Sequence, residues 1–312
     1  MDFIELISGL IILLIGGELI VKGAVLTANK FNISPMVIGL TVVSFGTSAP
    51  ELLVSLKAAT LGNPDIAVGN IVGSNIANIA LVLGVTVLFI PIVLDRSKIL
   101  FNWAFMMLAT IAFYCFSING WIENWEGIIL FIALIMFIYF AVKLSKKSDF
   151  EASEYDLKNK SNHNPFILIF YLLAGVLGLY FGAEFLVNGA VSIAQKMGMS
   201  EAVIGVTVVA LGTSAPELTA SIVAAYRKES GISIGNLIGS NIFNIMAVIG
   251  ITGIIKPISI APKILSFDMY WLMGISFLIL PFILIGRKIG RIKGLILLII
   301  YVVYVMLVLN QQ

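Results

Sequence analysis

Long apolar runs dominate the chain and recur at the length of a membrane span. A helix needs about 20 predominantly apolar residues to cross the hydrocarbon core of a bilayer. Ten segments meet this criterion, at residues 4–27, 36–60, 66–90, 99–118, 125–143, 165–194, 202–226, 232–255, 267–286 and 292–309. The pattern predicts an all-α polytopic membrane protein with ten transmembrane helices.

Polar positions gather in one stretch near the middle of the chain. Residues 144–164 are charged, low in hydrophobicity and end before Pro165. This stretch is too short to form a folded domain, so we interpret it as a linker. It divides the chain into a first five-helix unit at 1–143 and a second at 165–312.

The two units repeat one sequence. Residues 36–84 align with 202–250 without a gap, and 27 of the 49 aligned positions are identical. The same offset places GGELIVKGA (16–24) on GAEFLVNGA (182–190). Because five spans is an odd number, the second unit must enter the membrane from the opposite side. We therefore expect two inverted five-helix repeats related by a pseudo-two-fold axis in the membrane plane.

The basic residues report on orientation. With the N-terminus outside, four basic residues lie in the outer loops and flanks: Lys57, Lys196, Lys256 and Lys263. The inner loops and flanks then carry fifteen: Lys22, Lys30, Arg96, Lys98, Lys143, Lys146, Lys147, Lys158, Lys160, Arg227, Lys228, Arg287, Lys288, Arg291 and Lys293. Lys and Arg are enriched in cytoplasmic loops. The excess predicts a multi-pass cell-membrane protein with both termini outside and the linker 144–164 in the cytoplasm.

Composition agrees with a lipid environment and narrows the chemistry. Hydrophobic residues make up 60% of the chain and charged residues 12%, about half the charged share of a soluble domain. The net charge of +2 gives no indication of a nucleic-acid partner. The single Cys115 excludes an internal disulfide or a cysteine metal cluster, and the single His163 lies in the linker. We expect neither a zinc site nor a bound cofactor.

Two spans contain the segment GTSAPE, at 46–51 and 212–217. Proline removes a backbone donor and disrupts the preceding helical turn, and glycine permits unusual dihedral angles. Each segment therefore predicts a broken helix with free carbonyl groups. Irregular backbone at membrane depth is tolerated where protein or a water-filled cavity surrounds it. Carbonyl, hydroxyl and carboxylate oxygens suit Na⁺, Ca²⁺ or Mg²⁺ rather than soft metals.

The sharpest feature of these segments is a pair of acids, Glu51 and Glu217. A charged side chain at the bilayer centre costs about 2.5 kcal/mol or more on insertion scales. The two spans contain no Lys or Arg at that depth. A bound cation or a proton would compensate the charge. The alternative is a protonated Glu that bonds between helices, which the symmetric pairing disfavours.

The spans that follow contain GNIVGSNIANI (69–79) and GNLIGSNIFNI (235–245). Their GxxxG spacing lets helices approach closely, although that pattern alone indicates only packing. Serine and asparagine four residues apart share one helix face in each span: Ser74 with Asn78, and Ser240 with Asn244. Such a face opposite a carboxylate would make a cation cage. The remaining asparagines are interpreted as residues that hold helix breaks or neighbouring helices together: Asn70, Asn75, Asn236 and Asn241.

Glu18 and Glu184 form another symmetric acidic pair. Lys22 follows Glu18 by one helical turn and is a candidate partner for it, whereas Asn188 holds that position after Glu184. We interpret both acids as inter-helix hydrogen-bonding or entrance residues rather than as ion ligands.

These motifs resemble the alpha repeats of the sodium/calcium exchangers, within the cation/calcium exchanger superfamily. The resemblance covers nearly the whole chain. It implies ten helices, with spans 2, 3, 7 and 8 as a central core and spans 1 and 6 as long tilted helices that slide across it. The long regulatory calcium-binding insert of animal exchangers is absent, so the chain is similar to the prokaryotic type.

The resemblance also implies ion ligands. Glu51 and Glu217 match the paired acids of the calcium site. The other matching positions are Thr47 and Thr213 for carbonyl and hydroxyl ligands, Ser48, Ser214, Ser74 and Ser240 for the flanking sodium ligands, Ser44 and Ala210 for backbone carbonyls, and Asn78 and Asn244 for the amide or acid on the partner helices. Some relatives, including those that co-transport potassium, have Asp where Asn244 stands. Asn there lowers the formal charge of the site to −2.

The function implied is antiport of Na⁺ against Ca²⁺ by alternating access at a mid-membrane site, with the monomer as functional unit. Ca²⁺/H⁺ antiport by the same fold stays open, because both acids could take up protons instead of sodium. A passive cation channel is a third possibility, although channels usually arrange several subunits around a pore. An enzyme is the hardest interpretation to support, since no nucleophile–base pair stands near the acids.

Overall fold

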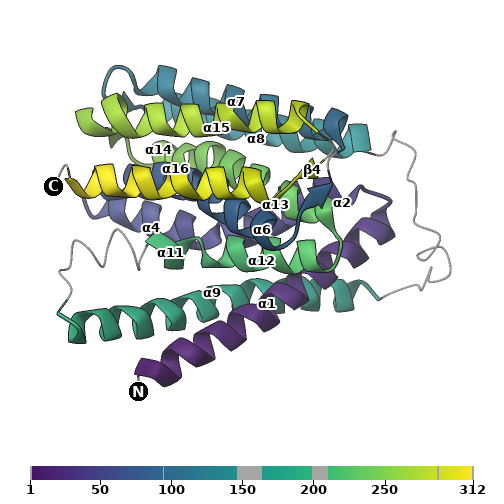
Figure 1. The fold of residues 1–312 in the computed structure, drawn as a ribbon. Helices are drawn as coiled ribbons and strands as arrows, with labels where there is room; N and C mark the ends of the chain where they lie inside the picture. Colours follow the sequence, from purple (N-terminus) through teal and green to yellow (C-terminus); the bar gives the residue numbers. More distant parts are fainter. Residues whose placement is uncertain (1, 94, 146–163, 199–209, 287, 311–312) are drawn as a thin grey trace.

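The structure is a computed structural model that describes residues 2–93, 95–145, 164–198, 210–286 and 288–310. Helices account for nearly all of this part of the chain (Figure 1). The α-helices are α1 (Asp2–Phe31), α2 (Pro35–Ile38), α3 (Ser44–Thr47), α4 (Ala49–Thr60), α5 (Pro64–Ala77), α6 (Gly84–Phe89), α7 (Arg96–Ser117), α8 (Asn124–Ser145), α9 (Pro165–Lys196), α11 (Ala210–Thr213), α12 (Ala215–Tyr226), α13 (Ser230–Phe243), α14 (Gly250–Ile255), α15 (Met269–Leu284) and α16 (Arg291–Asn310). In the described residues, four π-helical segments continue neighbouring helices: η1 (Gly39–Val43), η2 (Asn78–Leu83), η5 (Asn244–Ile249) and η6 (Ile264–Asp268).

The expected membrane spans are present wherever the structure describes them. Eight helices in the described part of the chain are long and apolar enough to cross a membrane. The helix pair Pro35–Thr47 and Ala49–Thr60 adds a ninth span with a bend of 46°. The expected span 202–226 is described from Ala210 onward, as α11 and α12, so the tenth crossing stays a prediction. The linker prediction at 144–164 lies almost wholly outside the described residues.

The sequence repeat is also a structural repeat. Helix α12 occupies the positions of α4 shifted by 166 residues, and the continuous helix Ser230–Ile255 matches Pro64–Phe89 at the same offset. The π-helical turn inside each long helix recurs at that offset too, as η2 and η5. The two halves therefore share local irregularities as well as sequence.

Short β-bridges join the halves. Strand β1 (Ile92–Val93) pairs antiparallel with β4 (Lys288–Ile289), and β2 (Trp121–Ile122) pairs with β3 (Ile258–Ser259). Each pair takes one strand from each half of the chain. Figure 1 shows α1 beginning and α16 ending at the same end of the bundle, as an even number of spans requires.

The two helices Pro64–Phe89 and Ser230–Ile255 form the centre. In their most apolar 18-residue windows 78% and 83% of residues are buried, against 33% for α1 and 17% for α16. Helices α4 and α12 pack on these two central helices. The outer faces of α1, α8, α9 and α16 remain apolar and exposed, as expected for surfaces that face lipid.

Helices α1 and α9 pack closely on one another at one edge of the bundle, where α1 runs obliquely to its neighbours (Figure 1). They are the longest helices in the described part of the chain, with 30 and 32 residues. Glycines make the contact possible, because a Cβ on Gly16 would lie 2.6 Å from the Leu179 nitrogen and one on Gly175 would lie 2.6 Å from the Ile20 nitrogen. This agrees with the two long tilted helices that the resemblance implied.

Candidate functional site

Both GTSAPE segments break their helices at the serine. Ser48 has φ −89° and ψ 4°, and Ser214 has φ −88° and ψ 3°, so the two breaks have the same backbone conformation. Pro50 and Pro216 lie in the first turn of the helices that follow, where the missing amide hydrogen is not needed. The prediction of two equivalent broken helices is confirmed.

The break places the acids in the first turn of α4 and α12. Glu51 and Glu217 are the acidic residues there, and both are buried, with 1% and 0% of their surface exposed. The amino-terminal end of a helix carries a partial positive charge that favours a carboxylate. None of the ion pairs among the described residues involves either acid.

Most of the carboxylate oxygens of Glu51 and Glu217 have no hydrogen-bond partner in the described structure. Both oxygens of Glu51 and Oε2 of Glu217 are buried and unpartnered in the described structure. Oε1 of Glu217 accepts a hydrogen bond of 3.2 Å from Oγ of Ser48. Buried polar atoms are nearly always hydrogen-bonded, so several unpartnered oxygens in one region require an explanation.

The expected amide ligands show the same property. Oδ1 of Asn78 and Oδ1 of Asn244 are buried without a partner, as is Oγ of Ser214. Asn78 and Asn244 each begin a π-helical segment, an irregularity that is frequent at functional sites. Helix α4 packs on α5 and η5, and α12 packs on α13 and η2. The packing brings these unpartnered oxygens from both repeats toward one region.

Hydroxyl groups of the first break contact the second repeat. Oγ1 of Thr47 donates to Oδ1 of Asn236 at 3.1 Å and lies 3.3 Å from Oγ of Ser240. The Ser44 hydroxyl donates to the backbone carbonyls of Gly39 and Asn236, at 2.7 and 3.0 Å. The backbone oxygen of Ser44, which the resemblance implied as a ligand, accepts hydrogen bonds from the Ser48 nitrogen at 2.9 Å and from the Thr47 hydroxyl at 3.3 Å.

Three further residues predicted as ion ligands have a known place in the fold. Ser74 is buried on α5, and Thr213 lies in α11 immediately before the second break. Ala210 begins α11, and its side-chain surroundings lie outside the described structure. The ligand roles of all twelve predicted residues stay predictions.

The interpretation of Asn70 and Asn236 as supporting residues is confirmed. Nδ2 of Asn70 donates to Oγ of Ser55 at 3.0 Å and to the Glu51 carbonyl at 3.5 Å. Asn236 makes the equivalent bonds to Ser221 and to the Glu217 carbonyl, at 3.1 and 3.4 Å. Each asparagine therefore ties the acid-bearing helix to the central helix of its own repeat.

The glycines of the second GxxxG pattern pack as expected. A Cβ on Gly235 would lie 3.0 Å from the Leu40 nitrogen, and one on Gly239 would lie 2.6 Å from the Leu40 carbonyl oxygen. The close approach joins α13 to the first broken helix. Among the described residues, a Cβ on Gly69 or on Gly73 would meet nothing within 4 Å, so close packing at the first GxxxG pattern stays a prediction.

The suggested pairing of Glu18 with Lys22 is wrong. Glu18 instead pairs with Arg227, at 2.5 Å, at the end of α12. The hydrogen bonds that the Arg227 guanidinium donates to the Glu18 carboxylate raise the pKa of Arg227 above its ordinary value. The ammonium group of Lys22 lies 4.6 Å from the ring centre of Tyr171 on α9. Glu18 is therefore an inter-helix residue, whereas Glu184 is exposed on α9.

The arrangement of helices and oxygen atoms defines a class of protein. A helical membrane bundle holds two buried acids and several amide and hydroxyl oxygens at paired helix breaks. Discontinuous helices of inverted repeats, meeting at such a site, are typical of secondary transporters. An oxygen-only set of this kind fits a hard cation such as Na⁺ or Ca²⁺.

Comparisons with known proteins agree with this class. The family model described as sodium/calcium exchanger protein matches residues 2–143 and 167–310, and the chain belongs to that family. The sodium/calcium exchanger MaX1 of Methanosarcina acetivorans is 32% identical over 339 residues, covering 97% of each chain. The solved structure of the sodium/calcium exchanger from Methanococcus jannaschii has a TM-score of 0.81 and 34% identity, covering 98% of this chain and 97% of that one.

A structure of the exchanger NCX_Mj soaked with Na⁺ and Sr²⁺ is also similar. It has a TM-score of 0.84 and 34% identity, covering 98% of this chain and 97% of that one. The family prediction is thus confirmed, as is the prediction of an all-α, multi-pass membrane protein, whereas the count of ten helices stays a prediction.

Proposed function

We propose that this protein is a secondary active antiporter that exchanges Na⁺ for Ca²⁺ across the membrane. The observation that carries the proposal is the set of unpartnered buried oxygens on Glu51, Glu217, Asn78, Asn244 and Ser214. Each of these oxygens can coordinate a cation. Leaving a buried polar group without a partner costs free energy of folding. A bound cation would satisfy them together.

Charge balance explains how one site could serve two ions. Two carboxylates neutralise one Ca²⁺ or two Na⁺, and neutral hydroxyl and amide oxygens could hold a further Na⁺. Occupation by Ca²⁺ and by Na⁺ is then mutually exclusive. Without ions, two buried negative charges would stay uncompensated, so movement between access states should be unfavourable when the site is empty. That coupling produces exchange rather than leak.

The moving part, on this proposal, is the pair α1 and α9. They pack on each other through glycines, and each also contacts α12 in the core. Alternating access in inverted-repeat transporters is largely rigid-body movement of one unit against another. We take 1–143 and 165–312 as the two inverted units, with both termini outside, the linker 144–164 in the cytoplasm and one chain as the functional unit.

Ca²⁺/H⁺ exchange is less favoured. Protons would need only the two carboxylates, whereas the site also carries hydroxyl and amide oxygens from both repeats that a proton does not use. Transport involves no bond-breaking step, so we assign no catalytic residues and no resident cofactor.

The test is uptake of ⁴⁵Ca²⁺ into proteoliposomes that contain the purified protein. An outward Na⁺ gradient should drive uptake, and an equal outward K⁺ gradient should not. Uptake that ignores Na⁺ but follows a pH gradient would replace the proposal with Ca²⁺/H⁺ exchange. Uptake without any counter-ion would indicate a channel.

A further inference from the structure

Two buried asparagines, Asn75 and Asn241, form reciprocal bonds between the repeats. Nδ2 of Asn78 donates to Oδ1 of Asn241 at 3.2 Å. Nδ2 of Asn244 donates to Oδ1 of Asn75 at 3.0 Å. Both bonds cross from one central helix to the other, and the two are equivalent under the 166-residue offset.

The bonds fix which end of each amide faces the site. A carboxamide carries its NH₂ and its oxygen on opposite sides, so binding the NH₂ turns the oxygen the other way. The oxygens of Asn78 and Asn244 are the ones left buried and unpartnered. We propose that Asn75 and Asn241 are positioning residues that hold the amides of Asn244 and Asn78 with their oxygens toward the bound cation. This inference rests on the function proposed above.

The positioning residues are themselves held in the required orientation. Nδ2 of Asn75 donates to the backbone carbonyl of Asn241 at 3.3 Å. Nδ2 of Asn241 lies 3.6 Å from Sδ of Met106, as a weak donor contact. Because each residue uses its own NH₂ elsewhere, its oxygen is the group that faces the amide across the repeat interface.

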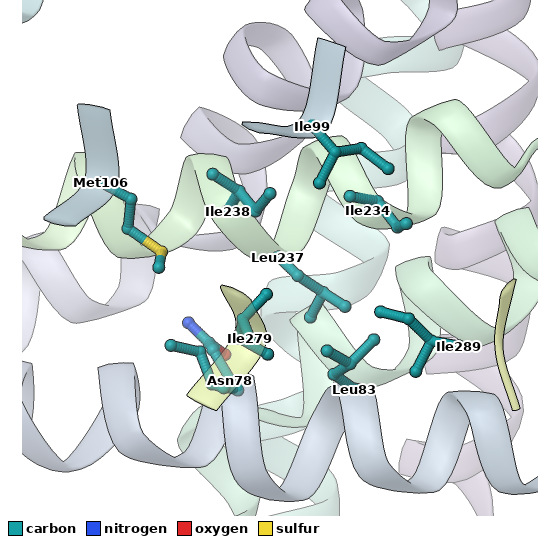
Figure 2. Close-up of a pocket in the computed structure, with 10 residues that line it drawn as sticks. Asn78, Leu83, Ile99, Met106, Ile234, Leu237, Ile238, Ile279 and Ile289 are labelled. Carbon is teal, nitrogen blue, oxygen red and sulfur yellow. The ribbon is translucent and has the colours of Figure 1, made fainter. Parts of the chain in front are cut away.

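On the side where Asn78 faces a small cavity, no other lining side chain has an oxygen that could accept a hydrogen bond from its NH₂ in place of Asn241. Asn78 lines a cavity of about 20 Å³, and the other nine lining side chains, which include Met106 and Leu237, are apolar (Figure 2). A water there would have Asn78 as its only polar side-chain partner among the lining residues, whereas buried water usually makes about three hydrogen bonds. Without the Asn241 oxygen, the NH₂ of Asn78 loses its hydrogen-bond acceptor, so its amide oxygen is no longer held toward the cation.

The experiment uses the Ca²⁺ half-saturation of Na⁺-driven uptake by the full chain in proteoliposomes. Asn241→Leu removes the acceptor while keeping the side-chain size similar. Loss of a partner that orients a metal ligand typically costs 10- to 100-fold in affinity. We expect the half-saturating Ca²⁺ concentration to rise by about that factor, and likewise for Asn75→Leu.

A double-mutant cycle separates orientation from general packing. Asn78→Asp replaces the amide by a carboxylate with oxygen at both positions, so no orientation is needed. In the Asn78→Asp background, Asn241→Leu should raise the half-saturating Ca²⁺ concentration less than about threefold. The reason is that a carboxylate at position 78 presents an oxygen to the cation without a partner to orient it. In the Asn244→Asp background it should keep its full effect, since Asn241 bonds to Asn78 and not to Asn244.

Equal effects of Asn241→Leu in both backgrounds would overturn the inference. If Asn241→Leu does not give folded protein, Asn241→Asp keeps the acceptor oxygen and should retain the wild-type half-saturation within about threefold. A tenfold loss in Asn241→Asp would also contradict the assignment. Failure of the wild-type chain to take up Ca²⁺ under a Na⁺ gradient would instead refute the proposed function.

Discussion

The hydroxyl of Ser48 donates a hydrogen bond of 3.2 Å to Oε1 of Glu217, so the break in one repeat contacts the acid of the other. The equivalent hydroxyl, on Ser214, is buried without a partner, and both oxygens of Glu51 are unpartnered. The two halves therefore share a backbone conformation but differ in their hydrogen bonds. A hydroxyl that donates to a carboxylate keeps lone pairs that can bind a cation.

Removing the Ser48 hydroxyl should weaken ion binding without abolishing exchange. A single hydrogen bond or neutral ligand contributes about 1 kcal/mol, which corresponds to about a fivefold change in half-saturation. We expect Ser48→Ala to raise the half-saturating Na⁺ concentration by about that factor in proteoliposome flux. Ser117→Ala is the matched control, because that buried hydroxyl bonds only within α7, to Phe113. An equal effect of both substitutions would contradict the assignment.

Neutralising either acid should abolish exchange while leaving the fold intact. Glu51→Gln and Glu217→Gln keep side-chain size but remove the charge that balances Ca²⁺. Because each acid is buried and outside any ion pair among the described residues, we expect the melting temperature in detergent to stay constant or rise. Ca²⁺ flux should fall more than about 100-fold, since one site charge is lost. Retained flux in either variant would show that the acid is not required.

Glu18→Gln should retain exchange. The carboxylate of Glu18 is partly exposed and pairs with Arg227, away from the unpartnered oxygens. Exposed ion pairs contribute little to stability, so the melting temperature should change little. Glu184→Gln serves as the comparison, because it occupies the equivalent position on α9. Loss of flux in Glu18→Gln as complete as in Glu51→Gln would make Glu18 an ion ligand.

A single methyl group at the crossing of α1 and α9 should destabilise the protein. In Gly175→Ala the new Cβ would lie 2.6 Å from the backbone nitrogen of Ile20, and a backbone atom cannot move aside easily. Overpacking of this kind costs about 1–3 kcal/mol, to be measured as a lower melting temperature. Gly274→Ala on α15 meets nothing within 4 Å and should be neutral or stabilising. Equal melting temperatures for the two variants would refute the close crossing.

The repeat and its two breaks could be predicted from sequence because their causes are local. Proline and glycine disrupt a helix wherever they stand within it. The length of an apolar segment is enough to predict a transmembrane helix. The predicted limits 267–286, for example, lie within three residues of the observed Ile264–Leu284. That Glu51 and Glu217 make no ion pair among the described residues also followed from the sequence, because no Lys or Arg lies at their depth in the two spans.

Contacts between distant residues could not be predicted in the same way. The spacing of Glu18 and Lys22 suggested a pair, but the fold brings Arg227 to Glu18 from 209 positions away. Likewise, the sequence placed Asn75 and Asn241 among supporting residues without showing which amide each would bond. Those bonds depend on how the two repeats are packed together, which no local pattern encodes.

On the proposed function, Ca²⁺ and Na⁺ compete for one site built on Glu51 and Glu217. Equilibrium binding of ⁴⁵Ca²⁺ to the purified protein in detergent, titrated with Na⁺, tests it most directly. We predict one Ca²⁺ per chain, complete displacement by Na⁺ along a sigmoidal curve, and no binding in Glu51→Gln or Glu217→Gln. Ca²⁺ that stays bound at saturating Na⁺, or that binds normally to either variant, would contradict a shared site on these two acids.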